Sequence, residues 1–246
     1  MTDKTNKVAI VTGASRGIGA AVAERLASDG FAVIINYSSD ARSAETLERK
    51  IKDNGGRALA AKADVSNPNA VRDMFDAAER AFGGVDVLIN NAGIMKLAKI
   101  ADSDDALFDQ QIAINLKGNF IAMREAAKRL RDGGRIVNFS TSVVGTRLET
   151  YGVYAATKSA VETMTAILSK ELRGRNITVN AVAPGPVATE LFLSGKSPEL
   201  IDRLAKMNPM ERLGTPEDIA SAVAFLVGPD GGWINGQVLR ANGGMV

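Results

Sequence analysis

The residues best suited to chemistry are a tyrosine and a lysine four positions apart, Tyr154 and Lys158. Positions i and i+4 of a helix share a face, so a helix here places the phenol beside the ammonium. A free tyrosine has a pKa of ~10, and a neighbouring cation favours its ionised form. Such a pair can donate or accept a proton. The alternative, for this spacing alone, is a surface tyrosine beside a solvated lysine.

The composition restricts the other catalytic options. The chain has 246 residues and contains neither His nor Cys. Ser-His-Asp and Cys-His machinery is therefore excluded, and because the usual zinc ligands are missing we expect no metal site. Proton transfer near neutral pH falls to Tyr, Lys, Asp or Glu with a shifted pKa.

A second chemical feature is the glycine-rich segment T-G-A-S-R-G-I-G at residues 12–19. Glycines permit a tight turn, and bare backbone lets a pyrophosphate approach the N–H groups at a helix N-terminus. A purely structural glycine turn is the alternative. The residues of this segment predicted to bind a dinucleotide are Gly13, Ser15, Arg16, Gly17, Ile18 and Gly19.

The same segment matches G-x-S-x-G, the turn that presents a nucleophilic serine in hydrolases. That chemistry needs a histidine, which the chain lacks, and no S-x-x-K pair offers a lysine instead. The Gly-Lys-Ser/Thr ending of a nucleotide-triphosphate loop is also missing. Dinucleotide binding is therefore the favoured interpretation.

The end of the second predicted strand indicates which dinucleotide binds. It reads I-N-Y-S-S from residue 35, without the Asp or Glu that usually binds the ribose 2′-OH of NAD. A neutral Asn36 does not repel a 2′-phosphate, and Arg16, Ser38 and Ser39 can donate hydrogen bonds to it. We expect NADP(H) to be favoured over NAD(H), although Asp40 lies close by.

The strands and helices that position these residues are indicated by the sequence pattern. Short β-branched runs alternate with longer amphipathic stretches along the chain. The alternation predicts an α/β fold of the Rossmann type, a doubly wound parallel sheet of about seven strands with helices on both faces. Strands are predicted at 8–12, 32–36, 58–63, 85–90, 135–140, 178–183 and 237–240. Helices are predicted near 18–29, 40–54, 68–82, 103–131, 152–173 and 215–227. Residues 186–214, between the sixth strand and the last helix, are predicted to form a lid.

Length, charge and hydropathy limit the number of domains, the type of partner and the location that we expect for this protein. No linker or repeat divides the chain, so we expect a single catalytic domain over residues 1–246. A net charge of +2 is too balanced to indicate nucleic acid as the main partner. The first residues are polar and no apolar run reaches about 18 residues, so we expect a cytoplasmic protein without a membrane segment.

The sequence resembles the classical short-chain dehydrogenase/reductase family along essentially its whole length. The matching pieces occur in order, each after a predicted strand or on the expected helix. They are T-G-x-x-x-G-I-G at 12–19, D-V at 64–65, N-N-A-G at 90–93, Asn115 in N-L-K-G, Ser142, Y-x-x-x-K at 154–158, and P-G at 184–185 with Thr189.

The resemblance implies a role for each catalytic residue. Tyr154 would donate a proton to the carbonyl oxygen in reduction and accept it in oxidation, and Ser142 would hydrogen-bond that oxygen. Lys158 would bind the nicotinamide ribose and lower the Tyr154 pKa. Asn115 would hold a water that continues the proton relay to solvent.

The resemblance also implies cofactor contacts beyond the first turn. Residues 64–65 would meet the adenine, the 90–93 turn the adenine ribose, and the segment after the sixth strand the carboxamide. The predicted contacts from these segments are Asp64, Val65, Asn91, Ala92, Gly93, Pro184, Gly185, Val187 and Thr189, together with Tyr154 and Lys158.

The sequence departs from the family pattern at two positions. The family serine commonly precedes the tyrosine by 13 residues, where this chain has Thr141. We favour Ser142 because S-V-V-G-T matches the family segment, with one residue missing from the following loop. Asn242 stands where relatives often carry Asp, which puts a contact near the C-terminus in doubt.

A substrate cavity is expected between Tyr154 and the lid. Its apolar lining indicates an aliphatic or aromatic carbonyl compound rather than a sugar phosphate. The predicted lining residues are Met95, Val144, Leu148, Tyr151, Leu191, Phe192, Met207 and Met210.

Among subfamilies, the similarity is greatest to 3-oxoacyl-[acyl-carrier-protein] reductases of fatty acid biosynthesis, which use NADPH. This favours an acyl thioester substrate. A basic surface for an acidic carrier protein, or alternatively an ordinary solvated face, is formed by Lys128, Arg129, Arg131, Arg173 and Arg175. The alternatives are a ketone reductase or alcohol dehydrogenase acting on free small molecules, and a dinucleotide-binding regulator without catalysis. Relatives pair through a segment resembling residues 233–240, so we expect a homotetramer or homodimer.

Overall fold

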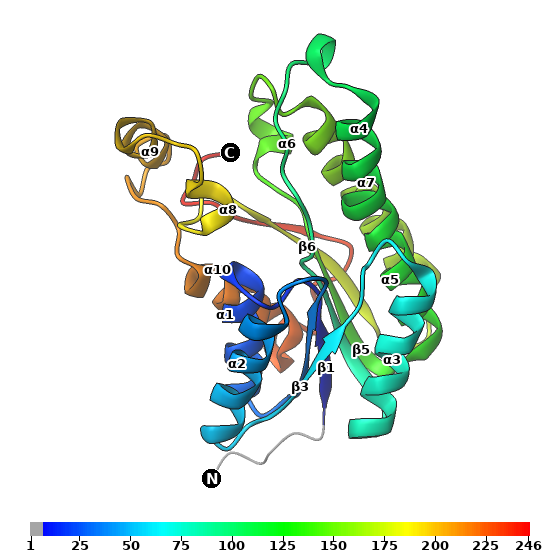
Figure 1. The fold of residues 1–246 in the computed structure, drawn as a ribbon. Coiled ribbons are helices and arrows are strands. Elements are labelled where there is room, and N and C mark those ends of the chain that lie inside the picture. The colour runs from blue at the N-terminus through cyan, green and yellow to red at the C-terminus, as the bar shows by residue number, and fades with distance from the viewer. Residues whose placement is uncertain (1–6) are drawn as a thin grey trace.

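The centre of the molecule is a parallel sheet in the order β3-β2-β1-β4-β5-β6-β7 (Figure 1). The structure is a computed structural model and describes residues 7–246; most of the polar segment noted at the start of the sequence lies outside the described residues. The strands are β1 Val8–Val11, β2 Ala32–Tyr37, β3 Arg57–Lys62, β4 Val85–Asn90, β5 Leu130–Phe139, β6 Thr178–Pro184 and β7 Val238–Ala241. The predicted fold class is confirmed.

The strand residues are buried on both faces of the sheet. In β1, Ala9 and Val11 belong to one buried cluster and Val8 and Ile10 to the other. Successive side chains of a strand point to opposite faces, so this division shows that helices cover the sheet on both sides. It also explains why the strands read as continuous apolar runs.

The helices lie in two layers. Helices α1, α2 and α10 cover one face, and α3, α5 and α7 cover the other (Figure 1). Their bounds are α1 Gly17–Ser28, α2 Ala41–Asp53, α3 Pro68–Phe82, α4 Asp105–Gln111, α5 Asn119–Arg129, α6 Val143–Thr146, α7 Gly152–Glu171, α8 Glu190–Leu193, α9 Pro198–Ala205 and α10 Pro216–Val227. Short 3-10 turns span Ile100–Asp102 and Pro229–Gly231.

The predicted helix over 103–131 is not one regular helix. Between α4 and α5 the chain forms a π-helical segment, Ile112–Gly118. The Asn119 side chain donates to the Asn115 carbonyl (2.9 Å), which satisfies a backbone group inside the widened turn. The helix also ends at Arg129, because residues from Leu130 onward already belong to β5.

The predicted lid, residues 186–214, is a loop whose two ends meet. Gly214 N donates to Pro186 O and Ala188 N donates to Gly214 O, both at 2.9 Å, so the loop closes on a short parallel bridge. The lid contains two short helices that the sequence pattern did not predict, α8 and α9. Thr189 and Ser197 cap their first turns with side-chain oxygens.

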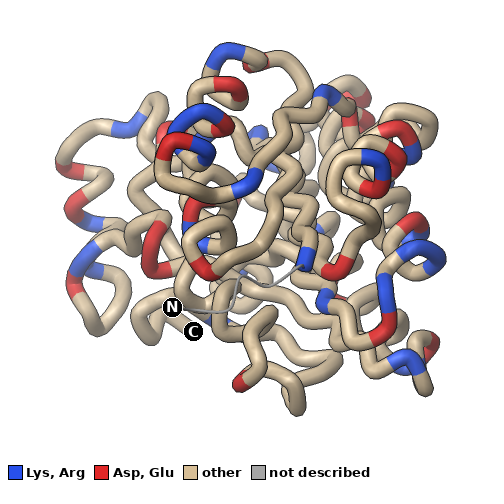
Figure 2. The backbone as a smooth tube through the Cα atoms, turned by 90° about the horizontal axis from the view of Figure 1, so that it is seen from below, with Lys and Arg blue, Asp and Glu red and all other residues tan. Residues whose placement is uncertain are grey.

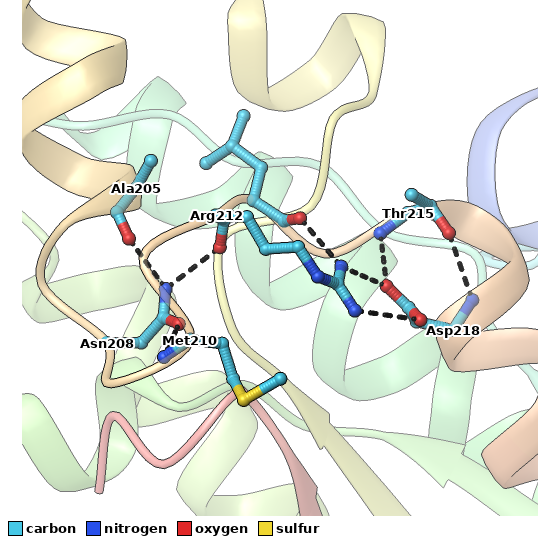
Figure 3. Close-up of polar contacts among 7 residues, drawn as sticks. Ala205, Asn208, Met210, Arg212, Thr215 and Asp218 are labelled. Carbon is cyan, nitrogen blue, oxygen red and sulfur yellow. Dashed lines mark hydrogen bonds and ion pairs between the residues drawn. The ribbon is translucent and has the colours of Figure 1, made fainter.

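The end of the lid is fixed by side chains (Figure 3). The Asn208 amide donates to Ala205 O and Arg212 O, and its oxygen accepts from Met210 N. The Arg212 guanidinium bonds the Asp218 carboxylate (2.6 and 3.2 Å), which caps α10 together with Thr215. The lid therefore ends on a braced turn.

Figure 2 shows Lys and Arg interspersed with Asp and Glu along the backbone, seen from below the view of Figure 1. Among the described residues, no helix is both long and apolar enough to cross a membrane.

Candidate functional site

Two adjoining cavities lie at the carboxyl ends of the strands, where parallel sheets of this kind bind ligands. The outer groove (about 1230 Å³) lies over the ends of β1, β2 and β4. The inner cavity (about 970 Å³) lies between α7 and the lid. The two share six lining residues, so they form one continuous site: Ile18, Asn91, Gly93, Ile94, Thr189 and Leu191.

The wall of the outer groove is the glycine turn after β1. Gly13 adopts a left-handed φ of +61°, and a Cβ there would lie 2.9 Å from the Ala92 Cα, so only glycine fits. Asn91 reaches across from the end of β4 and donates to the carbonyls of Thr12 (2.9 Å) and Gly13 (3.0 Å). The turns after β1 and β4 are therefore one unit.

Asn36, at the end of β2, lines the outer groove, and its predicted contact with the cofactor stays a prediction. It is 1% exposed. Its side-chain oxygen accepts from Gly13 N (3.1 Å), and its amide donates to Ala63 O (3.0 Å) and Ala61 O (3.3 Å). Because both ends of the amide are used by backbone, Asn36 shapes the turn.

Arg16, Ser38 and Ser39 line the outer groove, as predicted. The Arg16 guanidinium pairs with Glu190 of the lid at 2.9 Å, across an exposed gap. Asp40 caps α2 by accepting from Ser43 N, and this bond, with a smaller contribution from Arg16, holds the pKa of Asp40 below its ordinary value. A ligand anion in this part of the groove would compete with Glu190 for Arg16.

Tyr154 and Lys158 lie one turn apart on α7 and both line the inner cavity. The Lys158 ammonium lies 5.9 Å from the centre of the Tyr154 ring. It donates to Phe139 O at 2.7 Å and is only 3% exposed. The solvated lysine considered as the alternative is therefore excluded.

Burial controls the protonation of this pair. It raises the pKa of Tyr154 to about 12, although a hydrogen bond from Thr141 acts in the opposite direction. It lowers the pKa of Lys158 to about 8. Desolvation is the largest influence on the Tyr154 pKa in the chain alone, and the lowering expected from Lys158 stays a prediction. The phenol is protonated at neutral pH.

Thr141 and Ser142 both line the inner cavity beside Tyr154, and the predicted role of Ser142 stays a prediction. The Ser142 hydroxyl donates to Ala183 O (3.3 Å) and accepts from the Asn242 amide (2.9 Å), so its proton is directed away from the phenol. The Thr141 oxygen accepts from Val143 N, which leaves its proton to act on Tyr154. Thr141 stands 13 residues before Tyr154, the common family spacing, whereas Ser142 begins the S-V-V-G-T run that matches the family segment.

Asn115 lies in the π-helical segment and is completely buried. Its side-chain oxygen accepts from Ile94 N (2.8 Å), and its amide donates to Ile94 O (2.9 Å). A Cβ on Gly93 would lie 3.2 Å from the Asn115 oxygen and 3.6 Å from the Lys158 nitrogen. Asn115 thus holds the 93–94 turn against the lysine, and its predicted water-holding role stays a prediction.

All other predicted cofactor-binding residues line one of the cavities. In the outer groove these are Ser15, Gly17, Ile18, Gly19, Asp64, Val65, Ala92 and Gly93; in the inner cavity they are Pro184, Gly185, Val187 and Thr189.

The predicted substrate lining is partly correct. Met95, Leu148, Tyr151, Leu191 and Phe192 line the inner cavity. Val144, Met207 and Met210 do not: the methionines are exposed beyond α9, and the 141–146 turn directs Val143 to the cavity instead. Lining residues that the sequence did not indicate are Ile94, Thr146, Leu204 and Met245 in the inner cavity, and Tyr37, Ile114 and Glu190 in the outer groove.

The outer groove fits a dinucleotide on its own geometry. Arg16 is the N-cap of α1 but makes no side-chain cap hydrogen bond, which leaves the first-turn N–H groups to an outside acceptor. Gly13 and Gly17 keep side chains away from those groups. A phosphate at this helix N-terminus would satisfy them.

Comparisons with known proteins agree with this geometry. A family model described as enoyl-(acyl carrier protein) reductase matches residues 13–246. A short-chain type dehydrogenase/reductase of Picea abies is 48% identical, covering 98% of this chain and 92% of its own length. The chain belongs to the classical short-chain dehydrogenase/reductase family. This dehydrogenase/reductase is therefore an oxidoreductase.

Two further comparisons concern similar proteins whose names or structures include NADPH or NADP. A protein of Arabidopsis thaliana named NADPH-dependent aldehyde reductase-like protein, chloroplastic, is 46% identical, covering 98% of this dehydrogenase/reductase and 94% of its own length. A short-chain dehydrogenase from Burkholderia cenocepacia J2315, solved in complex with NADP, superposes with a TM-score of 0.93 at 38% identity and covers 98% of both chains.

Proposed function

We propose that this enzyme uses NADPH to reduce the carbonyl group of free aldehydes or ketones. The observation that carries the proposal is the Tyr154 phenol beside Lys158, in an apolar cavity that is continuous with the groove over the N-terminus of α1. The relative named as an NADPH-dependent aldehyde reductase and the neighbour bound to NADP support this choice.

Tyr154 acts as the general acid. A substrate oxygen beside the phenol accepts its proton, while the cofactor supplies the hydride to the carbonyl carbon. With substrate bound, the Thr141 hydroxyl turns its one proton from Tyr154 to the same oxygen and so stabilises the negative charge that develops there. In the reverse direction the Tyr154 phenolate takes the proton from the alcohol.

Lys158 and Asn115 support this acid. The Lys158 ammonium, held by Phe139 O, stabilises the phenolate that remains after Tyr154 gives up its proton, and it lies where the nicotinamide ribose is expected. Asn115 fixes the 93–94 turn beside the lysine. A water held near Asn115, continuing the relay to solvent, remains part of the proposal.

Selection of NADP(H) over NAD(H) is assigned to Arg16, with Ser38 and Ser39, around the 2′-phosphate. Asn36 contributes indirectly, because a neutral residue shapes the turn where an acidic side chain would repel the phosphate.

A 3-oxoacyl thioester on a carrier protein is the second candidate. It is favoured by the family model, which is described as that of an acyl carrier protein reductase. Against it, three of the predicted docking residues already make ion pairs within the chain: Arg129 with Asp76 and Glu79, Arg131 with Asp86, and Arg175 with Asp132.

The test is NADPH oxidation with a panel of free aldehydes and aliphatic and aromatic ketones, and with acetoacetyl thioesters of coenzyme A and of a carrier protein. The proposal predicts turnover of free carbonyls with higher kcat/KM than either thioester. Thioester reduction alone would favour the second candidate. NADPH binding without turnover of any compound would favour the regulator. Light scattering on the same preparation tests the predicted homotetramer or homodimer.

A further inference from the structure

Residues 242–246, after β7, lie between the lid and the turn that carries Ser142. Figure 1 shows the C-terminal end of the chain between α9 and α6. A Cβ added to Gly145 of α6 would lie 3.1 Å from the Val246 side chain, so the two segments touch. Between these contacts, Met245 forms part of the wall of the inner cavity.

Asn242 is the residue that holds this segment. It is 9% exposed and every polar atom of its side chain is used. The amide donates to the Ser142 hydroxyl at 2.9 Å. The side-chain oxygen accepts from Gly244 N (3.0 Å) and Met245 N (3.2 Å). One amide thus joins the catalytic turn to the backbone of Met245.

The segment also contacts the lid. Gly243 and Gly244 both have left-handed φ values (+67° and +88°), which turn the chain back toward the cavity. A Cβ on Gly243 would lie 2.5 Å from the Asn208 side-chain oxygen, and one on Gly244 3.2 Å from Pro209. Asn208 is itself fixed by three hydrogen bonds at the braced end of the lid (Figure 3).

We propose that Asn242 fixes residues 243–246 between the catalytic turn and the lid, so that Met245 sets the largest carbonyl substrate the inner cavity admits. The proposal rests on the function proposed above and assigns its substrate specificity to Met245 and Asn242. A methionine wall is flexible and apolar, and shortening it leaves space that an apolar substrate group can fill.

The specificity test uses Met245→Ala and Met245→Phe, assayed with an aliphatic ketone and a bulky aromatic ketone. We expect Met245→Ala to raise the ratio of kcat/KM for the bulky over the small ketone by about tenfold, and Met245→Phe to lower it. Met210→Ala is the matched control, because Met210 contacts the same glycine segment but does not line the cavity. NADPH affinity should not change in any of these variants, since Met245 is outside the outer groove.

The role of Asn242 is tested by Asn242→Ala and Asn242→Asp. Alanine removes all four side-chain hydrogen bonds, including one from the amide to Val246 O, so we expect it to shift the substrate ratio in the direction of Met245→Ala. Aspartate keeps an oxygen for Gly244 N and Met245 N and accepts a bond from Ser142, so its ratio should remain near that of the wild type. A ratio that is unchanged in Asn242→Ala and Met245→Ala would overturn the proposal.

A measurement that does not depend on turnover keeps the proposal testable if the panel above fails. Met245 is half-buried in the wild type, whereas Met210 is exposed. Oxidation by dilute hydrogen peroxide, followed by peptide mass spectrometry, should therefore be several-fold slower at Met245 than at Met210. In Asn242→Ala the Met245 rate should approach that of Met210. Equal Met245 rates in both proteins would show that Asn242 does not hold the segment, whatever the enzyme reduces.

Discussion

At the scale of single residues, the site depends on which hydroxyl, that of Thr141 or that of Ser142, is able to donate a hydrogen bond to the substrate oxygen. Thr141 and Ser142 are neighbours in sequence, but Ser142 donates to Ala183 O while Thr141 acts on Tyr154. We predict that Thr141→Val lowers kcat by about 10²-fold, because the developing oxyanion loses a donor. Ser142→Ala should keep most of kcat, and lose about 1 kcal/mol of stability because Asn242 and Ala183 lose a partner. Steady-state kinetics of the two variants test this assignment. A larger loss of kcat in Ser142→Ala than in Thr141→Val would show that Ser142 is the donor to the substrate oxygen.

The second prediction at this scale concerns Arg16. Its guanidinium is the cation that lines the outer groove near the expected 2′-phosphate, and it now pairs with Glu190. Arg16→Ala should weaken NADPH binding by about 10- to 100-fold, the value of a hydrogen bond to a charged group, and leave NADH binding nearly unchanged.

Glu190→Gln is the matched variant for Arg16, because it removes the competing carboxylate and keeps the shape. It should strengthen NADPH binding by at most about fivefold, since exposed ion pairs contribute little. Titration of cofactor fluorescence measures both constants. Equal losses of NADPH and NADH in Arg16→Ala would contradict the assignment.

At the scale of elements, the turn after β1 depends on Asn36. The amide donates to the carbonyls of Tyr37, Ala61 and Ala63, and its oxygen accepts from Gly13 N, in a site that is 1% exposed. Asn36→Asp replaces the donor by an oxygen facing these carbonyls, so we predict a loss of about 1–3 kcal/mol in the free energy of unfolding. Urea denaturation without cofactor measures it, with exposed Ser38→Ala as the control. If Asn36→Asp left the free energy of unfolding unchanged, Asn36 would not stabilise the turn, and its role would be limited to contact with the cofactor.

The elements also show what the sequence can predict. The period of the apolar residues located the seven strands, and the Asn67-Pro68 start with Gly83 after the end located α3. The π-helical segment could not be predicted, because it depends on Asn119 bonding the Asn115 carbonyl. The lid helices α8 and α9 were not predicted because they lie in a segment rich in Pro and Gly, although Thr189 and Ser197 are ordinary N-caps.

Within the site, motifs located the cofactor-type residues better than the substrate cavity. The glycine turn and the Tyr-x-x-x-Lys pair each lie within one local element at a fixed spacing, so the sequence predicts their relative positions in the fold. The choice between Thr141 and Ser142 depends on how residues 142–146 turn, and the contribution of Met245 depends on a bond between residues 100 positions apart. Neither is a local signal.

At the scale of the whole molecule, the fold encloses both titrating groups and so determines the pH dependence. Tyr154, with a pKa of about 12, keeps its proton through the neutral range, whereas Lys158 loses its charge above a pKa of about 8. We predict that kcat/KM for reduction is flat from about pH 6 to 8 and falls above, while alcohol oxidation rises with pH because it needs the phenolate. Initial rates in both directions check this. A reduction rate that rises with pH would mean that the phenol is not the acid.

The most direct measurement of the central claim is the turnover of Tyr154→Phe with NADPH and the best ketone of the panel. The ring still fills the cavity in this variant, and only the proton that the phenol donates is lost. We predict that kcat falls by about 10²- to 10⁴-fold, the usual contribution of a general acid, while NADPH affinity stays near the wild-type value. A Tyr154→Phe enzyme that binds NADPH and retains wild-type kcat would contradict the account.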